Sequence, residues 1–234
     1  MPPIPPSRHH AGMPALGPAL TAEQARRVYD RIGRAQDWQR FYEDAATAEL
    51  VAHGDFAHAR AVVELGCGTG RFAARLLDRY LPPEAAYAGT DVSPRMVTLA
   101  TDRLRPWRDR ASVTLVTGDG GVPVKDRGAD RFVSNYVFDL LSPEATRAAL
   151  DDARRVLEPG GLLCIAGLTF GEHGISPAVS HLWRRVWARW PALVGGCRPI
   201  RIVDALEPAE WEIRHRRVVV TWGIASEAVI ATPR

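Results

Sequence analysis

A glycine-rich run, Glu64-Leu65-Gly66-Cys67-Gly68-Thr69-Gly70, is the part of this sequence best suited to hold a ligand. Glycine has no Cβ, so a ligand can approach the backbone of such a turn closely. The run begins inside residues 61–65, which are typical of a short buried strand. The spacing is G-x-G-x-G and not the G-x-G-x-x-G of dinucleotide-binding folds, which argues against a nicotinamide cofactor. A glycine-rich turn alone is weak evidence, because it can also be a tight turn without a ligand.

Two aspartates extend this pattern. Asp91 lies 21 residues after Gly70, at the end of a second predicted strand, where a carboxylate can accept hydrogen bonds from ribose hydroxyls. Asp119 follows a third predicted strand and could accept a hydrogen bond from an adenine amino group. Each could also be an ordinary loop residue. Together with Glu64 they mark the ends of three successive strands, and we expect those ends to meet at one edge of a parallel sheet.

Strand and helix patterns alternate around these residues. Strands are predicted at 61–65, 86–90, 112–117, 131–135, 162–167, 218–222 and 228–231, and helices at 71–80, 94–104, 143–157 and 177–190. Ser93 reads as a helix cap followed by Pro94, and Pro159-Gly160-Gly161 as a helix stop. The alternation predicts an α/β fold with a doubly wound, mostly parallel seven-stranded sheet. The last two strands are close enough to pair antiparallel.

Three units are expected along the chain. Residues 1–20 are rich in proline, glycine and alanine without periodicity, which predicts a disordered tail. Residues 21–55 predict an N-terminal helical lid with helices at 22–33 and 37–53, which could equally be packed on the next domain. Residues 56–234 form the main domain.

Composition narrows the class of protein. A net charge of +3 is too small to indicate a nucleic-acid partner without a clustered patch. The three cysteines have no disulfide or metal-ligand spacing, so we expect no metal and a reducing, cytoplasmic location. No run approaches the 18 or so apolar residues that a membrane span needs.

From about residue 60 to 167 the chain resembles the class I S-adenosylmethionine-dependent methyltransferases, especially small-molecule enzymes related to quinone-biosynthesis methyltransferases. The motifs that carry the resemblance are E-L-G-C-G-T-G at 64–70, G-T-D-V-S-P-R-M at 89–96, G-D-G at 118–120, D-R-F-V-S-N-Y-V-F-D-L-L at 130–141 and R-V-L-E-P-G-G at 155–161. The C-terminal strand pair also resembles the antiparallel pair of that Rossmann-like fold. The resemblance implies that S-adenosylmethionine is the cofactor.

The resemblance also implies a role for each matching residue. Gly66, Cys67 and Gly68 would lie along the methionine moiety, and Glu64 would orient its amino group. Asp91 would hold the ribose.

The adenine and the transferred methyl group would be contacted by a second set. Residues expected near adenine are Val92, Met96, Asp119 and Gly120. Asn135 and the adjoining Tyr136 would face the methyl-transfer site.

Methyl transfer from a sulfonium is an in-line displacement, so alignment is the main contribution expected of the enzyme. A general base is needed only where the nucleophile must lose a proton. Asp139 and His173 are the two candidates, although Asp139 also reads as a helix-entry or salt-bridge residue and His173 as a solvated loop residue. Many relatives carry histidine where this chain has Asp139, so the resemblance does not imply a quinone acceptor.

Residues 180–199 are rich in tryptophan and arginine, a combination that can bind nucleic acid. Trp183, Trp187 and Trp190 have the spacing of one helix face, which favours packing against the domain. The residues after the fourth strand, Asn135-Tyr136-Val137-Phe138, also lack the Asn/Asp-Pro-Pro-aromatic signature of many nucleic-acid amino methyltransferases. We therefore expect a small-molecule acceptor and a monomer or homodimer. The alternatives are a nucleic-acid or protein methyltransferase, or a non-catalytic module that binds S-adenosylmethionine.

Overall fold

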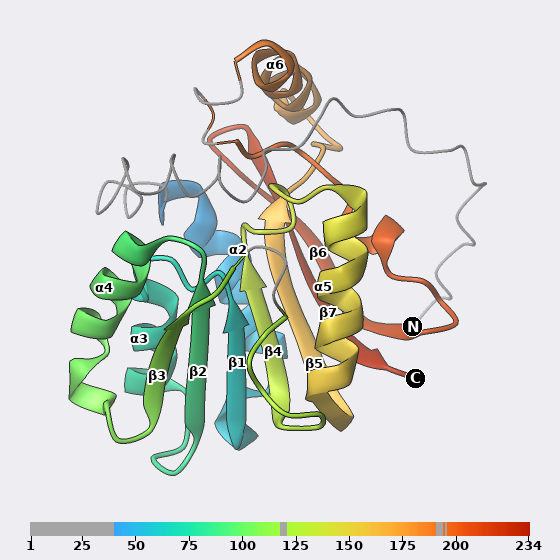
Figure 1. The fold of residues 1–234 in the computed structure, drawn as a ribbon. Coiled ribbons are helices and arrows are strands. Elements are labelled where there is room, and N and C mark those ends of the chain that lie inside the picture. Colours follow the sequence, from blue (N-terminus) through green and yellow to red (C-terminus); the bar gives the residue numbers. More distant parts are fainter. Residues whose placement is uncertain (1–39, 118–120, 191–193, 195) are drawn as a thin grey trace.

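The computed structural model describes residues 40–117, 121–190, 194 and 196–234, which form a seven-stranded sheet with helices on both faces (Figure 1). The strands are β1 (Ala61–Leu65), β2 (Ala86–Asp91), β3 (Ala111–Leu115), β4 (Ala129–Asn135), β5 (Leu157–Leu168), β6 (Trp211–Thr221) and β7 (Ile224–Pro233). Their order across the sheet is β3-β2-β1-β4-β5-β7-β6. The first five strands run parallel, and β7 runs antiparallel to both β5 and β6. The predicted fold class is confirmed.

The helices cover both faces of this sheet and its carboxyl edge. They are α2 (Arg40–His53), α3 (Arg71–Arg79), α4 (Pro94–Arg103), α5 (Pro143–Val156) and α6 (Ser176–Arg189). In Figure 1, α5 lies in front of the sheet, α3 behind it, and α6 beyond the carboxyl ends of the strands. One buried core cluster joins α2 and α3 to the sheet, and a second joins α5 to the opposite face. Loops that follow β1, β2, β4 and β5 therefore all emerge at the edge below α6.

Local signals set several helix boundaries as predicted. The Ser93 hydroxyl accepts a hydrogen bond from the Met96 amide, with Pro94 in the first turn of α4. Ser142 caps α5 in the same way, accepting from the Ala145 amide. None of the described helices is long and apolar enough to cross a membrane.

The largest differences from the predicted strand boundaries are at β5 and at the C-terminal hairpin. Helix α5 ends at Val156, but β5 begins at once with Leu157 and includes Pro159-Gly160-Gly161. The partner of Ala129 is Leu157 while that of Arg131 is Leu162, so β5 contains a bulge with extra residues relative to β4. The helix stop is therefore part of a strand.

The C-terminal hairpin is also longer than predicted, because β6 starts at Trp211 and β7 runs from Ile224 to Pro233. Strand β6 lies at the edge of the sheet, and its Arg214, Arg216 and Arg217 hide the usual apolar alternation. Charged residues are common on edge strands because they discourage pairing with other chains.

The described part of the predicted lid packs firmly on the domain. Tyr42, Ala46 and Leu50 of α2 are buried in the core. The buried Arg131 of β4 donates hydrogen bonds to the carbonyls of Gly54 and Asp55, both at 2.6 Å, which ties the end of α2 to the sheet. The tail at 1–20 and the first predicted helix lie outside the described residues, so a lid function stays a prediction.

Candidate functional site

The glycine-rich run forms a left-handed turn between β1 and α3 that favours glycine. Gly66, Gly68 and Gly70 have φ angles of +71°, +53° and +73°. A Cβ on Gly66 would lie 2.4 Å from Cγ2 of Val137, in the loop after β4. The turn is therefore both left-handed and in close contact with a neighbouring loop, which explains the glycine at 66.

Asp91 fixes this turn to the end of β2. Its carboxylate is 8% exposed and accepts hydrogen bonds from the Gly68 and Ser93 amides, each at 2.9 Å. The Cys67 amide also donates to the Thr90 carbonyl at 2.9 Å. Each carboxylate oxygen has more than one acceptor position, so Asp91 can hold the turn and still accept from ribose hydroxyls.

Glu64 and Asn135 form a polar pair on neighbouring strands. Glu64 is 1% exposed and accepts from the Tyr87 hydroxyl at 2.6 Å and from Asn135 Nδ2 at 3.1 Å. Burial raises the pKa of Glu64 to about 7, despite these two hydrogen bonds. Asn135 Oδ1 is buried without a hydrogen-bond partner among the described residues. A buried acceptor beside a carboxylate needs a donor, and the ammonium of a methionine moiety would supply one.

The remaining cofactor predictions are located only in part. Cys67 is 6% exposed, and its pKa is raised by burial and by the nearby Glu64 and Asp91 carboxylates. Met96 is fully buried at the start of α4, whereas Val92 is half-buried. Their contacts with adenine stay predictions. Asp119 and Gly120 lie outside the described residues.

Tyr136 begins a second group of polar side chains at the end of β4. Its φ of +56° is unusual for a bulky residue and marks a constrained backbone. The hydroxyl donates to Ser226 Oγ at 2.9 Å, and the amide donates to the Ala166 carbonyl at 2.7 Å. The ring packs edge-to-face on Tyr42 of α2, with 5.6 Å between ring centroids.

Asp139 and Glu43 complete this group, which we call the acceptor-side cluster: Tyr42, Glu43, Tyr136 and Asp139. Asp139 is fully buried, and burial raises its pKa to about 7 although Arg198 and backbone amides oppose the shift. Burial likewise raises the pKa of Glu43 to about 7, with Arg71 lowering it and Asp139 raising it. Two carboxyls that titrate near neutrality can take up or release a proton at physiological pH.

Sequence reasoning included Asp139 and Tyr136 but missed Tyr42 and Glu43 as members of a site. Both lie on α2, within residues 21–55, which were predicted to form a helical lid or equally to be packed on the next domain. No local signal separates a tyrosine that packs from one that also lines a site. Tyr42 is buried and Glu43 is half-buried only because of the way α2 packs on the sheet.

His173 is not part of this cluster. It is exposed in the loop between β5 and α6, and its ring makes no hydrogen bond or ion pair with any described residue. Only its carbonyl is engaged, by the amide and hydroxyl of Ser176. A catalytic role for His173 stays a prediction that the geometry does not support.

The tryptophan-rich helix behaves largely as the helix-face interpretation predicts. Trp187 is 4% exposed and donates from Nε1 to the Gly196 carbonyl at 2.8 Å. Trp183 is half-buried and donates to the Cys197 carbonyl at 2.9 Å. Trp190, the third member of the predicted face, is 57% exposed at the end of α6. The buried tryptophan face of α6 therefore ends at Trp187, about one turn before the predicted end at Trp190.

One group of described residues, Glu49, His53 and His215, brings possible metal-ligand atoms within 4.8 Å of one another. Glu49 Oε2 lies 3.6 Å from His53 Nε2 and 3.1 Å from His215 Nε2. The two rings are stacked with 3.6 Å between centroids and 16° between planes. Ring nitrogens bind metals in the ring plane, so two stacked rings do not direct their lone pairs to one point. As placed, the group is a polar contact between α2 and β6, and the prediction of no metal site stays untested.

Comparison with known proteins finds a methyltransferase domain within the chain. The model of a methyltransferase domain family matches residues 62–161, which run from β1 into β5 and contain the glycine turn, Asp91 and Asp139. Residues 62–161, somewhat less than half of the chain, are therefore similar to a methyltransferase domain. S-adenosylmethionine is therefore the cofactor of this domain, and the glycine turn with its buried acceptor at Asn135 fits its methionine end.

The names of the matching relatives indicate several different substrates. The chain is 28% identical to a demethylmenaquinone methyltransferase of Tropheryma whipplei, over 74% of this chain and 71% of that protein. It is 29% identical to the tRNA N(3)-methylcytidine methyltransferase Mettl2 of Drosophila melanogaster, over 57% of this chain and 42% of that protein. The chain spans less than half the length of two of the curated relatives it matches.

A solved structure extends the likeness to almost the whole chain. The cyclase SpnF has a TM-score of 0.68, covers 92% of this chain with 97% of its own, and is 19% identical. At this identity the match shows the fold. Because SpnF is named as a cyclase and not as a methyltransferase, the fold alone does not fix the reaction.

Proposed function

We propose that this chain transfers a methyl group from S-adenosylmethionine to a small organic acceptor, at an oxygen, nitrogen or carbon atom. The enclosed acceptor-side cluster is the observation that carries the proposal. Tyr42, Tyr136 and Asp139 are 4%, 8% and 0% exposed. Polar groups this deeply enclosed suit an acceptor that can itself be enclosed, whereas a polymer would need an open cleft.

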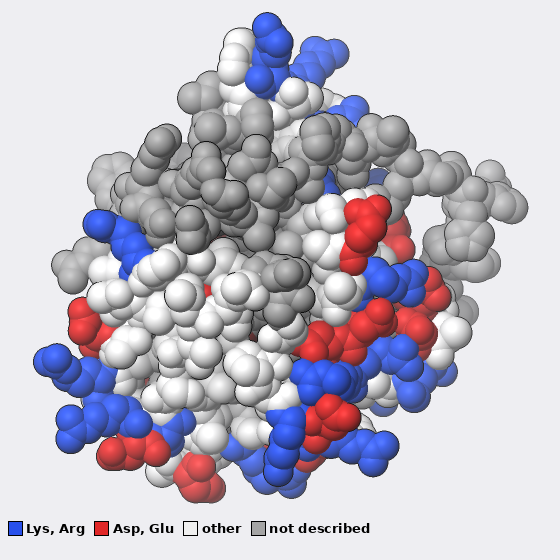
Figure 2. Space-filling view, in the orientation of Figure 1, with Lys and Arg blue, Asp and Glu red and all other residues white. Residues whose placement is uncertain are grey.

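The described surface supports the same choice over a nucleic-acid acceptor. In Figure 2, arginine and acidic side chains are interspersed around a mainly uncharged area, and the described part of this face shows no continuous basic stripe. Nucleic-acid affinity depends on a row of cations that neutralises phosphates, and adjacent carboxylates weaken it.

The residues of the glycine turn would hold and orient the cofactor. The bound cofactor supplies an electrophilic methyl group, and the contribution of the protein is alignment of that group with the acceptor. Glu64 and Asn135 Oδ1 would hold the methionine amino group, and Asp91 would hold the ribose. The backbone of Gly66 and Gly68 would leave space for the methionine chain.

Asp139 would act on the acceptor side. With a pKa raised to about 7, it exchanges a proton readily near neutral pH. Where the acceptor is a hydroxyl or an amine, Asp139 would receive the proton that the nucleophile releases. Where the acceptor carries no such proton, the cluster would act by shape and hydrogen bonding alone.

Calorimetric titration with S-adenosylmethionine, S-adenosylhomocysteine and NADH tests the cofactor site. We expect micromolar dissociation constants for the two sulfur compounds, which correspond to about 8 kcal/mol, and no heat of binding for NADH. The same protein is then incubated with methyl-labelled cofactor and with phenols, amines, carboxylic acids or bulk tRNA. Labelled product from a small molecule supports the proposal.

Two other results of these experiments would contradict the proposed function. Label that appears in tRNA but in none of the small molecules would replace the proposed acceptor with a nucleic acid. The absence of binding by both sulfur compounds would remove the catalytic role altogether.

A further inference from the structure

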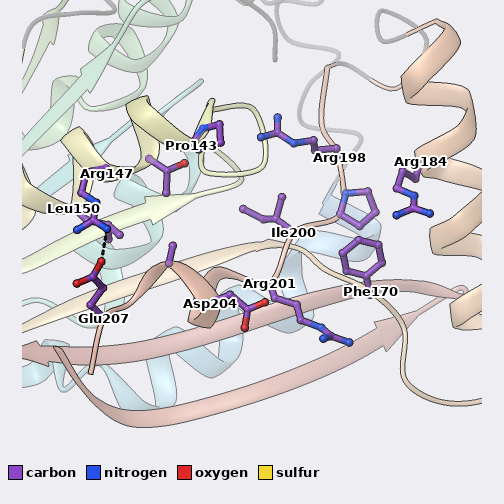
Figure 3. A pocket seen from close by; sticks show the side chains of 13 residues that line it. Pro143, Arg147, Leu150, Phe170, Arg184, Arg198, Ile200, Arg201, Asp204 and Glu207 are labelled. Atoms are coloured by element: carbon purple, nitrogen blue, oxygen red, sulfur yellow. Dashed lines mark hydrogen bonds and ion pairs between the residues drawn. The ribbon is translucent and has the colours of Figure 1, made fainter. Parts of the chain in front are cut away.

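A cavity of about 500 Å³ lies on the α5 face of the sheet, apart from every residue assigned above to the cofactor (Figure 3). Its walls come from the first half of α5, the chain just after β5, α6, and the segment 198–207. The lining residues that matter most for its chemistry are Arg147, Phe170, Arg184, Arg198, Ile200 and Arg201. Its volume is that of a site for a small organic molecule.

The two ends of this cavity differ in charge. At one end Arg147 is paired with Glu207, whereas Asp204 lies between that pair and Arg201 (Figure 3). At the other end Arg184 and Arg201 lie over the Phe170 ring, with guanidinium carbons 5.9 and 6.0 Å from its centroid. Neither of these two arginines forms an ion pair with a described residue. Positive charge at that end is therefore not neutralised by the described part of the protein.

Arg198 adds a buried cation to the wall of the cavity. The residue is only 3% exposed, and Nη2 donates to the Leu141 carbonyl. Its Nε and Nη1 atoms are buried without a hydrogen-bond partner in the described structure. Figure 3 shows this guanidinium extending toward Pro143 at the start of α5. Buried donors without acceptors are costly, so this arrangement favours an added anion.

The wall that carries these arginines is held in place by hydrogen bonds to the sheet. The Ile200 amide donates to the Leu168 carbonyl at 3.0 Å, and the Ile202 amide donates to Glu227 Oε2 at 2.8 Å. Glu227 is itself buried and accepts from Arg216 Nε at 2.6 Å. The cavity is thus preformed, which lowers the entropic cost of binding.

We propose that this cavity binds a small organic anion, a carboxylate or a phosphate ester with a flat or apolar body. The charged group lies beside Arg184 and Arg201, where a guanidinium group can bind it with paired hydrogen bonds. The body of the ligand packs on Phe170 and Ile200. The site is separate from the cofactor residues, so its occupation does not require S-adenosylmethionine.

Calorimetry with four probes tests this proposal on the full chain: benzoate, phenyl phosphate, benzyl alcohol and inorganic phosphate. We expect benzoate or phenyl phosphate to bind with a dissociation constant below about 1 mM, with or without S-adenosylmethionine. The arm that binds more tightly identifies the carboxylate or the phosphate ester as the ligand type. Benzyl alcohol and inorganic phosphate should bind at least about tenfold more weakly, because the first has no anionic group and the second has no apolar body.

Variants link the binding to the cavity. The double variant R184Q/R201Q should weaken the better probe at least about tenfold, since two charge-assisted contacts are lost. Arg185→Gln is the matched control, because Arg185 is exposed on the same helix and does not line the cavity. It should leave affinity within about twofold. If the double variant does not fold, Arg201→Gln alone is used, since Arg201 is exposed in a surface segment.

Two results would overturn the proposal. One is that neither benzoate nor phenyl phosphate binds more tightly than benzyl alcohol. The other is equal affinity in the wild type, the Arg201 variant and the Arg185 control. Loss of methyl transfer plays no part in either readout, so failure here is distinguishable from failure of the proposed methyltransferase activity.

Discussion

The two halves of the carboxyl edge of the sheet use buried carboxylates in opposite ways. At the β1–β2 half, Asp91 accepts two main-chain hydrogen bonds at 2.9 Å and joins the glycine turn to the next strand. At the β4–β5 half, Asp139 is fully buried without an ion pair to any described residue, and its pKa is raised to about 7. The first arrangement fixes a loop, and the second keeps a proton exchangeable.

This difference has a physical origin. Main-chain N–H groups in a turn are placed by local geometry and stabilise a carboxylate without adding a mobile charge. A carboxylate among tyrosines, a second carboxyl and a buried arginine loses hydration and receives only partial compensation. Binding sites for a fixed cofactor suit the first solution, and acid–base chemistry suits the second.

The largest effect is expected from breaking the glycine turn with Gly66→Ala. A left-handed φ of +71° and a Cβ 2.4 Å from Val137 should together lower the free energy of unfolding by about 2–5 kcal/mol. Affinity for S-adenosylmethionine should fall as well. Chemical denaturation and calorimetry measure the two effects.

Gly160→Ala is the matched control for that substitution. Gly160 has a φ of +80°, but no atom lies within 4 Å of a Cβ built on it. It should lose only about 1–2 kcal/mol, from the backbone conformation alone. Equal losses for the two variants would show that contact with the loop after β4 does not constrain the turn.

The second half is tested with Asp139→Asn, followed as a function of pH. The folded protein raises the pKa of Asp139 from 3.8 to about 7, so it binds this proton more tightly than the unfolded chain does. The wild type therefore loses stability as pH rises from about 4 to 7, by at most about 4 kcal/mol, and asparagine removes that loss. The variant should gain stability relative to the wild type over this range, as measured by denaturation at a series of pH values.

The same variant should lower the methyl-transfer rate where the acceptor releases a proton. Asp109→Asn, which changes a 96% exposed side chain, serves as control and should alter neither the rate nor the stability profile by more than about 0.5 kcal/mol. A stability difference between Asp139→Asn and the wild type that is constant from pH 4 to 8 would contradict the assignment.

A smaller effect is expected for Asp91→Ala, which removes the acceptor of the Gly68 and Ser93 amides. Affinity for S-adenosylmethionine should weaken by about 1–3 kcal/mol, the cost of a lost hydrogen bond to a charged group. Asp91→Asn retains one carbonyl oxygen and should lose less. Unchanged calorimetric affinity in a folded alanine variant would remove Asp91 from the cofactor site.

The smallest effect is expected from deleting residues 1–20. The sequence predicts that this segment belongs to neither half of the carboxyl edge of the sheet. Melting temperature and cofactor affinity should stay close to those of the full chain, because a segment without apolar periodicity has little to pack. A fall of more than about 4 °C, of the order produced by 1 kcal/mol, would show that the tail packs on the domain.

Sequence alone came close to the strands and helices of residues 61–156, because each signal there is local. Glycine spacing, a serine cap with a following proline, and short apolar runs act within a few residues of one another. Local patterns of this kind also predicted that Asp91 lies at the end of β2. Sequence patterns failed where two segments contribute jointly, as in the bulge that makes Pro159-Gly160-Gly161 part of β5.

What the sequence determined by itself is the fold class, the cofactor and the glycine turn at the end of β1. Only the tertiary structure brought Tyr42 and Glu43 of α2 to Asp139, and placed Arg184 and Arg201 beside Phe170 in one cavity. The reason is physical: a hydrogen-bonded turn is encoded by neighbours in the chain. A cluster of buried charges arises from burial, which depends on segments that are far apart in sequence and meet only when the sheet and its helices have packed.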